Sequence, residues 1–159
     1  AARTYEQALA LDDHDCRVWG NLGATYRLVE GRKAAADSAY RRAIVLAEGE
    51  SAVNRSDPMV LALLAQYHAE LHEFAAAREM AGRALEAGSS RPEVMVYVSA
   101  AYEILGERAA ALEAVRRAVA LGRSPETWSR DPNMDELVKD PEFRKIVAAA
   151  ELRRREGAR

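Results

Sequence analysis

Two histidines lie four residues apart, at His68 and His72, in the stretch HAELH. On a helix this spacing places both imidazole rings on one face, where they could share a metal ion. However, no cysteine lies nearby and no third ligand is evident, and His68 falls where related stretches carry tyrosine. We therefore interpret His68 as an inward-facing side chain and His72 as a helix-end residue whose ring suits the helix dipole, and we expect no metal site.

A second cluster of ionisable groups surrounds His14, which has Asp12, Asp13 and Asp15 as neighbours. A histidine beside a carboxylate is an arrangement used in acid–base catalysis. Here the cluster coincides with a loop and a helix start, so we interpret it as solvated. The sequence also lacks a glycine-rich phosphate loop and a GxSxG nucleophile motif. We expect neither a cofactor nor an enzymatic active site in this chain.

The bulk composition argues against several classes of partner. The 159 residues carry 23 Lys and Arg against 25 Asp and Glu, a formal charge of -2, so no overall field favours nucleic acid or an anionic membrane. Cys16 is the only cysteine, which excludes an intrachain disulfide and is compatible with a reducing cytoplasm, where we expect the protein. No apolar run approaches the roughly 20 residues of a transmembrane helix. Abundant arginine and alanine with little lysine suggest a bacterial source.

The elements that position these side chains are predicted to be helices. Residues 92–121 hold two amphipathic helical patterns joined at Gly106, where a helix would end in a left-handed residue. In the first pattern Met95, Val98 and Tyr102 recur at helical spacing. One such hairpin cannot bury both of its apolar faces, so it needs similar neighbours.

The sequence supplies those neighbours as repeats. Equivalent patterns begin at Cys16 and Pro58, and Pro58 and Pro92 are 34 residues apart. Cys16 and Pro58 are 42 residues apart, because one extra residue lies near Glu30 and seven more precede Asp57. Asp57 is the expected N-cap of a helix that has proline at its first position.

The repeat resembles the tetratricopeptide repeat family, whose unit is a helix-turn-helix with characteristic aromatic, Leu-Gly and Tyr positions. The closest match to the first-helix pattern is formed by Trp19, Leu22, Gly23 and Tyr26, and residues 61–65 and 95–102 match it more loosely. The late small position of the second helix is occupied by Ala8, Ala43, Ala84 and Ala118. The resemblance implies an all-α, right-handed superhelical solenoid of antiparallel helix pairs.

The resemblance also implies how the chain is divided into repeats and a C-terminal segment. We predict a repeat array over residues 1–123, made of a half repeat at 1–15 and full repeats at 16–57, 58–91 and 92–123. Because the half repeat matches a second helix, we expect that the natural protein continues upstream or that a partner covers this face. Residues 124–159 contain Ser-Pro and Asp-Pro signatures of helix starts, which predict two short helices and one longer one. Trp128 and Phe143 supply apolar surface with which this segment would cap the array.

In this family first helices line a concave face, so first-helix residues that point away from the core are the expected ligand contacts. Asn21 and Gln66 can both donate and accept hydrogen bonds with a peptide backbone, while Leu63 and Tyr97 offer apolar contact. By matching positions, the predicted peptide-binding groove consists of Arg17, Asn21, Ala24, Met59, Leu63, Gln66, Glu93, Val96, Tyr97 and Ala100.

Two functions from different classes follow from this interpretation. The first is a scaffold or adaptor that binds a peptide or helix segment of another protein in the groove. The second is a regulatory or targeting region of a larger polypeptide, such as a bacterial signalling kinase or transferase, whose chemistry lies elsewhere. A family branch that clamps C-terminal carboxylates is disfavoured, because Asn21 is kept but Ala24 and Leu63 stand where basic or polar residues are needed. A simpler alternative is that Met59, Leu63 and Tyr97 only pack against neighbouring helices or the tail.

Overall fold

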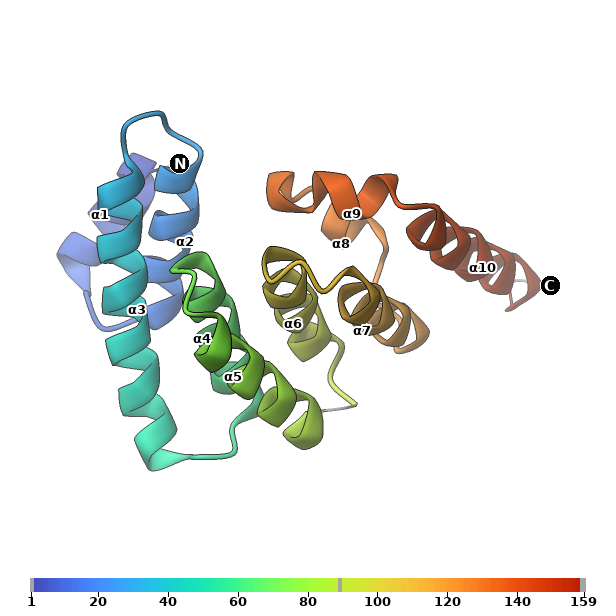
Figure 1. The fold of residues 1–159 in the computed structure, drawn as a ribbon, viewed down its shortest axis with the longest axis horizontal. Helices are drawn as coiled ribbons and strands as arrows, with labels where there is room; N and C mark the ends of the chain where they lie inside the picture. The colour runs from blue at the N-terminus through green and yellow to red at the C-terminus, as the bar shows by residue number, and fades with distance from the viewer. Residues whose placement is uncertain (1, 89, 158–159) are drawn as a thin grey trace.

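The computed structural model describes residues 2–88 and 90–157, and in this part of the chain it contains helices and turns but no strand (Figure 1). The helices are α1 (Ala2–Leu11), α2 (Cys16–Arg27), α3 (Lys33–Val53), α4 (Pro58–Glu70), α5 (Phe74–Ala87), α6 (Pro92–Ile104), α7 (Arg108–Ala120), α8 (Glu126–Ser129), the 3-10 helix η1 (Pro132–Met134), α9 (Asp135–Lys139) and α10 (Pro141–Gly157).

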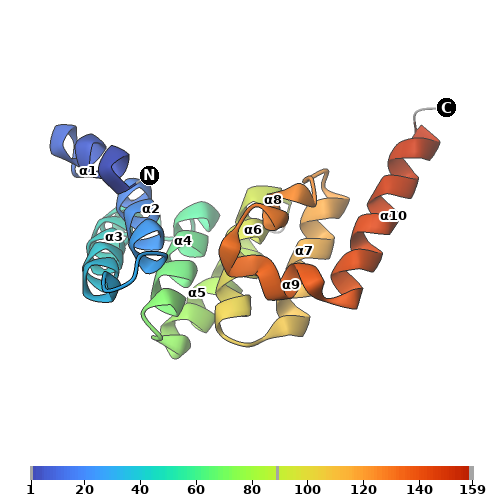
Figure 2. The ribbon, with the colours of Figure 1, turned by 90° about the horizontal axis from the view of Figure 1, so that it is seen from above.

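Consecutive helices form antiparallel pairs. The helix α2 packs on α3, α4 on α5, and α6 on α7, while α3 contacts α4 and α5 contacts α6 across the junctions. Figure 2 shows the resulting single row of helices, which runs from α1 at one end to α10 at the other. The predicted fold class, an all-α solenoid of antiparallel helix pairs, is confirmed.

Side-chain caps fix where the first helices begin. Oδ1 of Asp57 accepts hydrogen bonds from the amides of Met59 at 2.8 Å and Val60 at 3.3 Å, and Pro58 is the first residue of α4. Oδ1 of Asp15 accepts from the Arg17 amide at 2.8 Å. These bonds satisfy amides that have no partner inside the helix. The predicted helix start at Asp57 is thus confirmed, and Asp15 caps α2 in the same way.

Left-handed residues end the first helices. Gly31 and Gly106 both have a φ of 75°, which is the conformation that glycine adopts at low cost. At the equivalent turn of the middle pair His72 has a φ of 60°, although it carries a side chain. The turn is closed by a 2.9 Å bond from the amide of Glu73 to the carbonyl of His68. His72 therefore adopts a left-handed backbone conformation that is unusual for a residue with a side chain. Its place at the helix end was predicted, and its backbone conformation was not.

The core is built from small residues that allow helices to approach closely. Ala43, Ala84 and Ala118 are fully buried, at the late position of each second helix. At Gly23 a Cβ would lie 3.1 Å from the ring of Tyr40, so the ring packs directly against the helix backbone. A larger side chain at these positions would force the paired helices apart.

Phe74, the first residue of α5, is a large apolar side chain outside the core, with 42% of its surface exposed. Its ring instead meets the edge of the His72 ring, with 5.6 Å between the centroids.

The extra residues between the first and second pairs lengthen a helix. They extend α3 to Val53, so that α3 spans 21 residues while α5 spans 14. The backbones of α4 and α6 pack closely, whereas α2 and α4 approach each other mainly through side chains. The Tyr67 ring reaches from α4 to α2, where its hydroxyl donates to the carbonyl of Cys16 at 3.3 Å.

The C-terminal segment folds back on the last helix pair. Two short α-helices, a 3-10 turn and the longer α10 replace the regular pattern, in agreement with the predicted short and long helices. Trp128, Met134, Leu137 and Phe143 are at most 3% exposed and pack with residues of α6 and α7. Nε1 of Trp128 donates a 2.8 Å hydrogen bond to the Ser99 hydroxyl on α6. The segment therefore covers apolar surface at the end of the array, as a solenoid cap does.

Replacement of Trp128 by alanine is expected to lower the free energy of unfolding by about 3–5 kcal/mol, because it removes a buried aromatic side chain and leaves a cavity. Ser99→Ala is expected to cost about 1–3 kcal/mol, since it leaves the indole N–H buried without an acceptor. Urea unfolding followed by circular dichroism measures both changes. Leu152→Ala, at a position that is 57% exposed, is the control and should change stability little. A Trp128→Ala protein as stable as wild type would show that the segment is not a cap.

Candidate functional site

The predicted groove residues form a stripe along α2, α4 and α6. On α2 the stripe is open to solvent: Arg17 and Asn21 are exposed, and Ala24 is half-buried. The Arg17 guanidinium is held at the helix start by Asp15, with Nε of Arg17 3.2 Å from Oδ1 of Asp15. The Asn21 side-chain amide is therefore the accessible polar group in the middle of this helix.

On α4 the stripe is only partly accessible. Met59 and Gln66 are half-buried, but Leu63 is only 3% exposed and belongs to a core cluster that also contains Tyr67. Leu63 thus contributes to the helix packing that the simpler alternative proposed for it, and it offers little surface to a ligand. Gln66 is the polar group that this helix presents.

On α6 the chain's own tail covers part of the stripe. Glu93 is exposed, and Val96 and Tyr97 are half-buried. Ala100 is 5% exposed because it packs in the same cluster as Trp128 and Met134, and Val96 lies at the edge of that cluster. The accessible part of α6 is therefore centred on Tyr97, which packs instead toward α4.

The first two helix pairs are joined by a partly buried ionic network at the ends of α2 and α4. The Arg27 guanidinium lies 3.2 Å from a carboxylate oxygen of Asp37 and 3.4 Å from one of Glu70, and it also donates to the Glu70 carbonyl. Its charge lies 5.8 Å from the centroid of the Tyr40 ring. Glu70 is only 7% exposed, so Arg27 compensates a carboxylate that is largely removed from water.

Burial raises the pKa of Glu70, and the positive charge of Arg27 opposes that effect. The Asp131 carboxylate, in the turn between α8 and η1, raises the pKa of Glu70 further. Burial also raises the pKa of Tyr40, whose hydroxyl is buried without a hydrogen-bond partner in the described part of the chain.

Gly20 lies under the Tyr67 ring. A Cβ at this position would lie 2.5 Å from the Tyr67 hydroxyl oxygen, so glycine is required for the ring to cross from α4 to α2. The side-chain contact closes the space between these two helices where their backbones do not pack closely. The Tyr67 ring thus fills the space beneath the stripe between α2 and α4.

The two histidines of the HAELH stretch make local contacts. Nδ1 of His68 lies 2.5 Å from a carboxylate oxygen of Glu73, and the His72 ring packs against Phe74. His68 is half-buried rather than fully inward. Both rings contact residues at the turn between α4 and α5, and His72 lies at the helix end as the sequence indicated, whereas His68 differs from the inward-facing side chain that the sequence predicted.

The ligand atoms of Asp12, Asp13 and His14 all lie within 4.8 Å of one another. Nδ1 of His14 is 3.2 Å from Asp12 and 3.0 Å from Asp13, and the hydrogen bonds from His14 lower the pKa of Asp12. The His14 and Asp12 side chains are 81% and 73% exposed. This is an exposed surface cluster, and no second feature marks it as a binding site.

Cys16 does not have the properties of a reactive thiol. It is 1% exposed at the start of α2. Burial, followed by the charge of Glu50, raises the pKa of the thiol to about 12. The thiol is therefore protonated near neutral pH and cannot act as a thiolate nucleophile.

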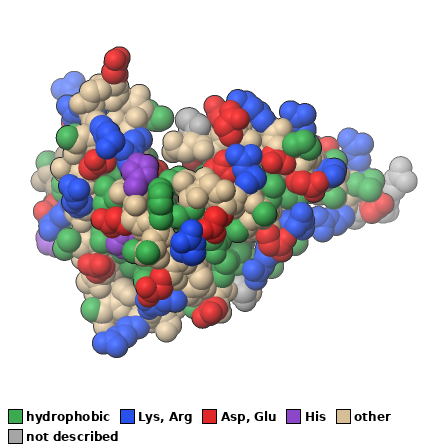
Figure 3. All heavy atoms as spheres, viewed as in Figure 1, with side chains coloured by type: hydrophobic (Ala, Val, Ile, Leu, Met, Phe, Trp, Pro, Cys, Tyr) green, Lys and Arg blue, Asp and Glu red, His purple; other side chains and the backbone are tan. Residues whose placement is uncertain are grey.

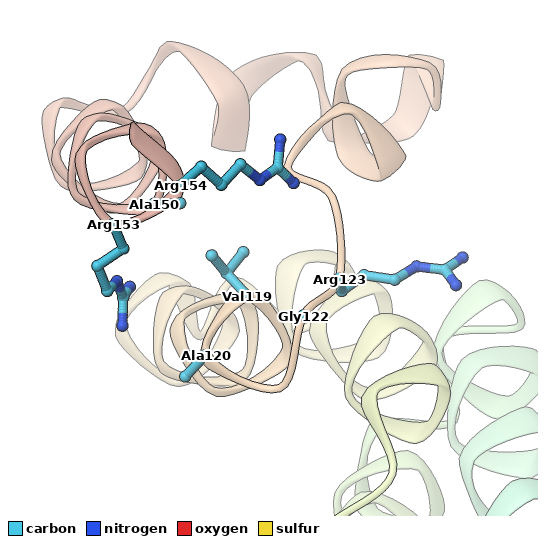
Figure 4. Close-up of a pocket in the computed structure, with 7 residues that line it drawn as sticks. All are labelled: Val119, Ala120, Gly122, Arg123, Ala150, Arg153 and Arg154. Atoms are coloured by element: carbon cyan, nitrogen blue, oxygen red, sulfur yellow. The ribbon is translucent and has the colours of Figure 1, made fainter. Parts of the chain in front are cut away.

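A cavity of about 230 Å³ lies between α7 and α10 and is lined by Val119, Ala150 and three arginines. Figure 4 shows that the side chains of Arg123, Arg153 and Arg154 extend in different directions from it. They do not converge on one point where an anion could be held. On the face of the molecule seen in Figure 3, carboxylates and basic side chains are mixed.

The comparisons with known proteins support the fold and leave the function open. No family model matches the chain, and no curated protein matches it. Among solved structures, the chain is similar to the crystal structure of MamA, with a TM-score of 0.53, 16% sequence identity and coverage of 99% of this chain and 88% of that chain. A crystal structure of MamA protein also matches with a TM-score of 0.43 and 19% identity, covering 98% of this chain and 84% of that one. At these identities the first similarity shows a shared helical fold.

None of the helices within residues 2–88 and 90–157 combines the length and the apolar character that a transmembrane segment needs.

The raised pKa of Glu70 predicts a specific dependence of stability on pH. The folded protein binds a proton at Glu70 more readily than the unfolded chain does, so this group's contribution is most favourable below the unfolded pKa of about 4.5 and is lost as the pH rises through the folded pKa. Relative to Glu70→Gln, the wild type should therefore lose stability between acidic and neutral pH. Urea unfolding at several pH values measures this difference.

In Glu70→Gln, Arg27 keeps Asp37 as an ionic partner, so the variant should fold. Glu48→Gln, at an exposed position of α3, is the matched control and should follow the wild type. Parallel pH profiles for wild type and Glu70→Gln would contradict the assigned burial of a charged Glu70.

Proposed function

We propose that this protein is an interaction scaffold that binds a peptide or helix segment of another protein along its first helices. The observation that carries the proposal is the accessible stripe of Asn21, Gln66 and Tyr97, one residue from each of the three first helices. Asn21 and Tyr97 hold equivalent repeat positions, and Gln66 lies about one helical turn further along its helix. The simplest occupant of a surface that crosses several parallel helices is an elongated ligand.

The chemistry of the stripe favours a polypeptide over a small metabolite. The amides of Asn21 and Gln66 each offer a donor and an acceptor, which match the alternating groups of a peptide backbone. The half-buried side chains of Met59 and Tyr97 add apolar contact beside them. Leu63 and Ala100 lie beneath this surface and hold its shape.

The tail limits the length of the segment that can bind. Trp128 and Met134 cover Ala100 and border Val96, so the open part of the stripe extends from α2 to Tyr97. A bound segment would thus lie mainly on the first two helix pairs. The regulatory or targeting region of a larger polypeptide would use the same surface, so the test below applies to both functions.

A photoreactive amino acid at position 21 tests the proposal in the source cell, because a segment bound on the stripe would be crosslinked from this position. The same amino acid at Glu48, which is exposed on α3, is the matched control. The crosslinked protein is then purified and its affinity measured by calorimetry. Tyr97→Asp should weaken binding at least about tenfold without loss of helicity, since it places an uncompensated charge in the contact.

Leu63 is unsuitable for this test, because a charge at a buried position would unfold the chain. A purified partner that binds wild type and Tyr97→Asp with equal affinity would contradict the proposed surface. Equal crosslinking from positions 21 and 48 would contradict it as well.

A further inference from the structure

The junction between the first and second helix pairs differs from the junction that follows it. The backbones of α4 and α6 pack closely, whereas those of α2 and α4 do not, although all three are first helices of their pairs. Close backbone contact between the first two pairs is instead formed by α3 and α4. The first pair is therefore attached to the rest of the array mainly through α3.

The contact between α3 and α4 is a continuous apolar core. Tyr40, Ala43 and Ala47 of α3 lie in one buried cluster with Val60 and Leu64 of α4. Packed helices can slide against each other by small amounts and remain in contact, as they do in shear motions of domains. This side of the junction can thus act as a pivot.

On the other side, two side chains form the polar bonds between α2 and α4 in the part of the chain that the structure describes. The Tyr67 hydroxyl donates at 3.3 Å to the carbonyl of Cys16, the first residue of α2. Arg27, the last residue of α2, lies 3.4 Å from a carboxylate oxygen of Glu70 and also donates to the Glu70 carbonyl. The two helices are therefore joined at the two ends of α2.

These side chains keep other partners when α2 moves away from α4. Arg27 is 3.2 Å from Asp37, which belongs to the same helix pair and moves with it. The Tyr67 ring packs against Tyr40 beside the pivot, with 5.9 Å between the ring centroids. Water that reaches Glu70 replaces its ionic partner, because the penalty for burying that carboxylate is then relieved. Separation of the two helices thus costs little.

From this asymmetry we infer that the junction is a hinge, at which the first helix pair pivots about the contact between α3 and α4. The helix α2 then swings toward or away from α4. This movement changes the distance between Asn21 on α2 and Gln66 on α4, so it sets the width of the accessible stripe. The effect on ligand binding rests on the proposed function, whereas the hinge itself does not.

Gly20 determines how closely α2 can approach α4. A Cβ at this position would lie 2.5 Å from the Tyr67 hydroxyl oxygen, while an ordinary contact needs about 3.5–4.0 Å. Gly20→Ala should therefore hold the hinge open. Gly82→Ala in α5 is the matched control, since a Cβ there meets no atom of another helix within 4 Å. Both substitutions favour the helical state to a similar extent.

Double electron–electron resonance between spin labels measures this movement in the full chain with no partner present. Labels on Asn21→Cys and Glu93→Cys, at exposed positions of α2 and α6, span the hinge. Labels on Glu79→Cys and Glu113→Cys, at exposed positions of α5 and α7, form a reference pair beyond it. Cys16→Ala removes the native thiol from both proteins.

Gly20→Ala should shift the distance between positions 21 and 93 to larger values by at least about 1 Å. It should leave the reference distance unchanged, and Gly82→Ala should change neither. Tyr67→Phe combined with Glu70→Gln weakens the bonds at both ends of α2 and keeps the side-chain shapes. This double variant should broaden the distribution between positions 21 and 93, and it decides alone if Gly20→Ala fails to fold.

An unchanged distance in folded Gly20→Ala would overturn the inference, because the Tyr67 ring would then move aside while α2 stays in place. An unchanged distribution in the double variant would overturn it as well. Equal changes in both label pairs would show that the whole array bends and that no hinge lies at this junction. Crosslinking from position 21 tests the stripe separately, so the hinge and the stripe can fail independently.

Discussion

The whole array depends on the close approach of paired helices at positions that only small side chains can fill. Ala43, Ala84 and Ala118 have no exposed surface, and the ring of Tyr40 packs directly on the backbone at Gly23. This packing fixes the distance within each pair, which in turn fixes which first-helix faces remain outside the core. The small residues at these positions thus determine which faces of the first helices remain accessible.

The two ends of the array differ, because the C-terminal segment after α7 packs on the last helix pair. Trp128 is buried against α6 and α7, and its indole N–H is satisfied by Ser99. The same contact that closes the core also occupies part of the surface on which a ligand would lie. Stability of the last pair and access to its stripe are therefore coupled, since both depend on how the tail packs.

Local features of the fold could be predicted from the sequence, because they depend on neighbouring residues. Asp15 and Asp57 mark helix starts through bonds to amides two residues away, and Gly106 marks a turn through its backbone freedom. The tail contact could not be predicted in the same way. Ser99 and Trp128 are distant in sequence, and no local pattern states that the indole of one meets the hydroxyl of the other. For the same reason the burial of Ala100 required the structure.

Positions where one helix pair differs from the others make contacts that the repeat pattern does not predict. Ser99 stands where the first pair has Gly23, and it provides the acceptor that anchors the tail. His72 stands where the other turns have glycine and keeps a left-handed backbone despite its side chain. The departure at Ser99 creates a contact between α6 and the tail, whereas the departure at His72 changes a turn within one helix pair.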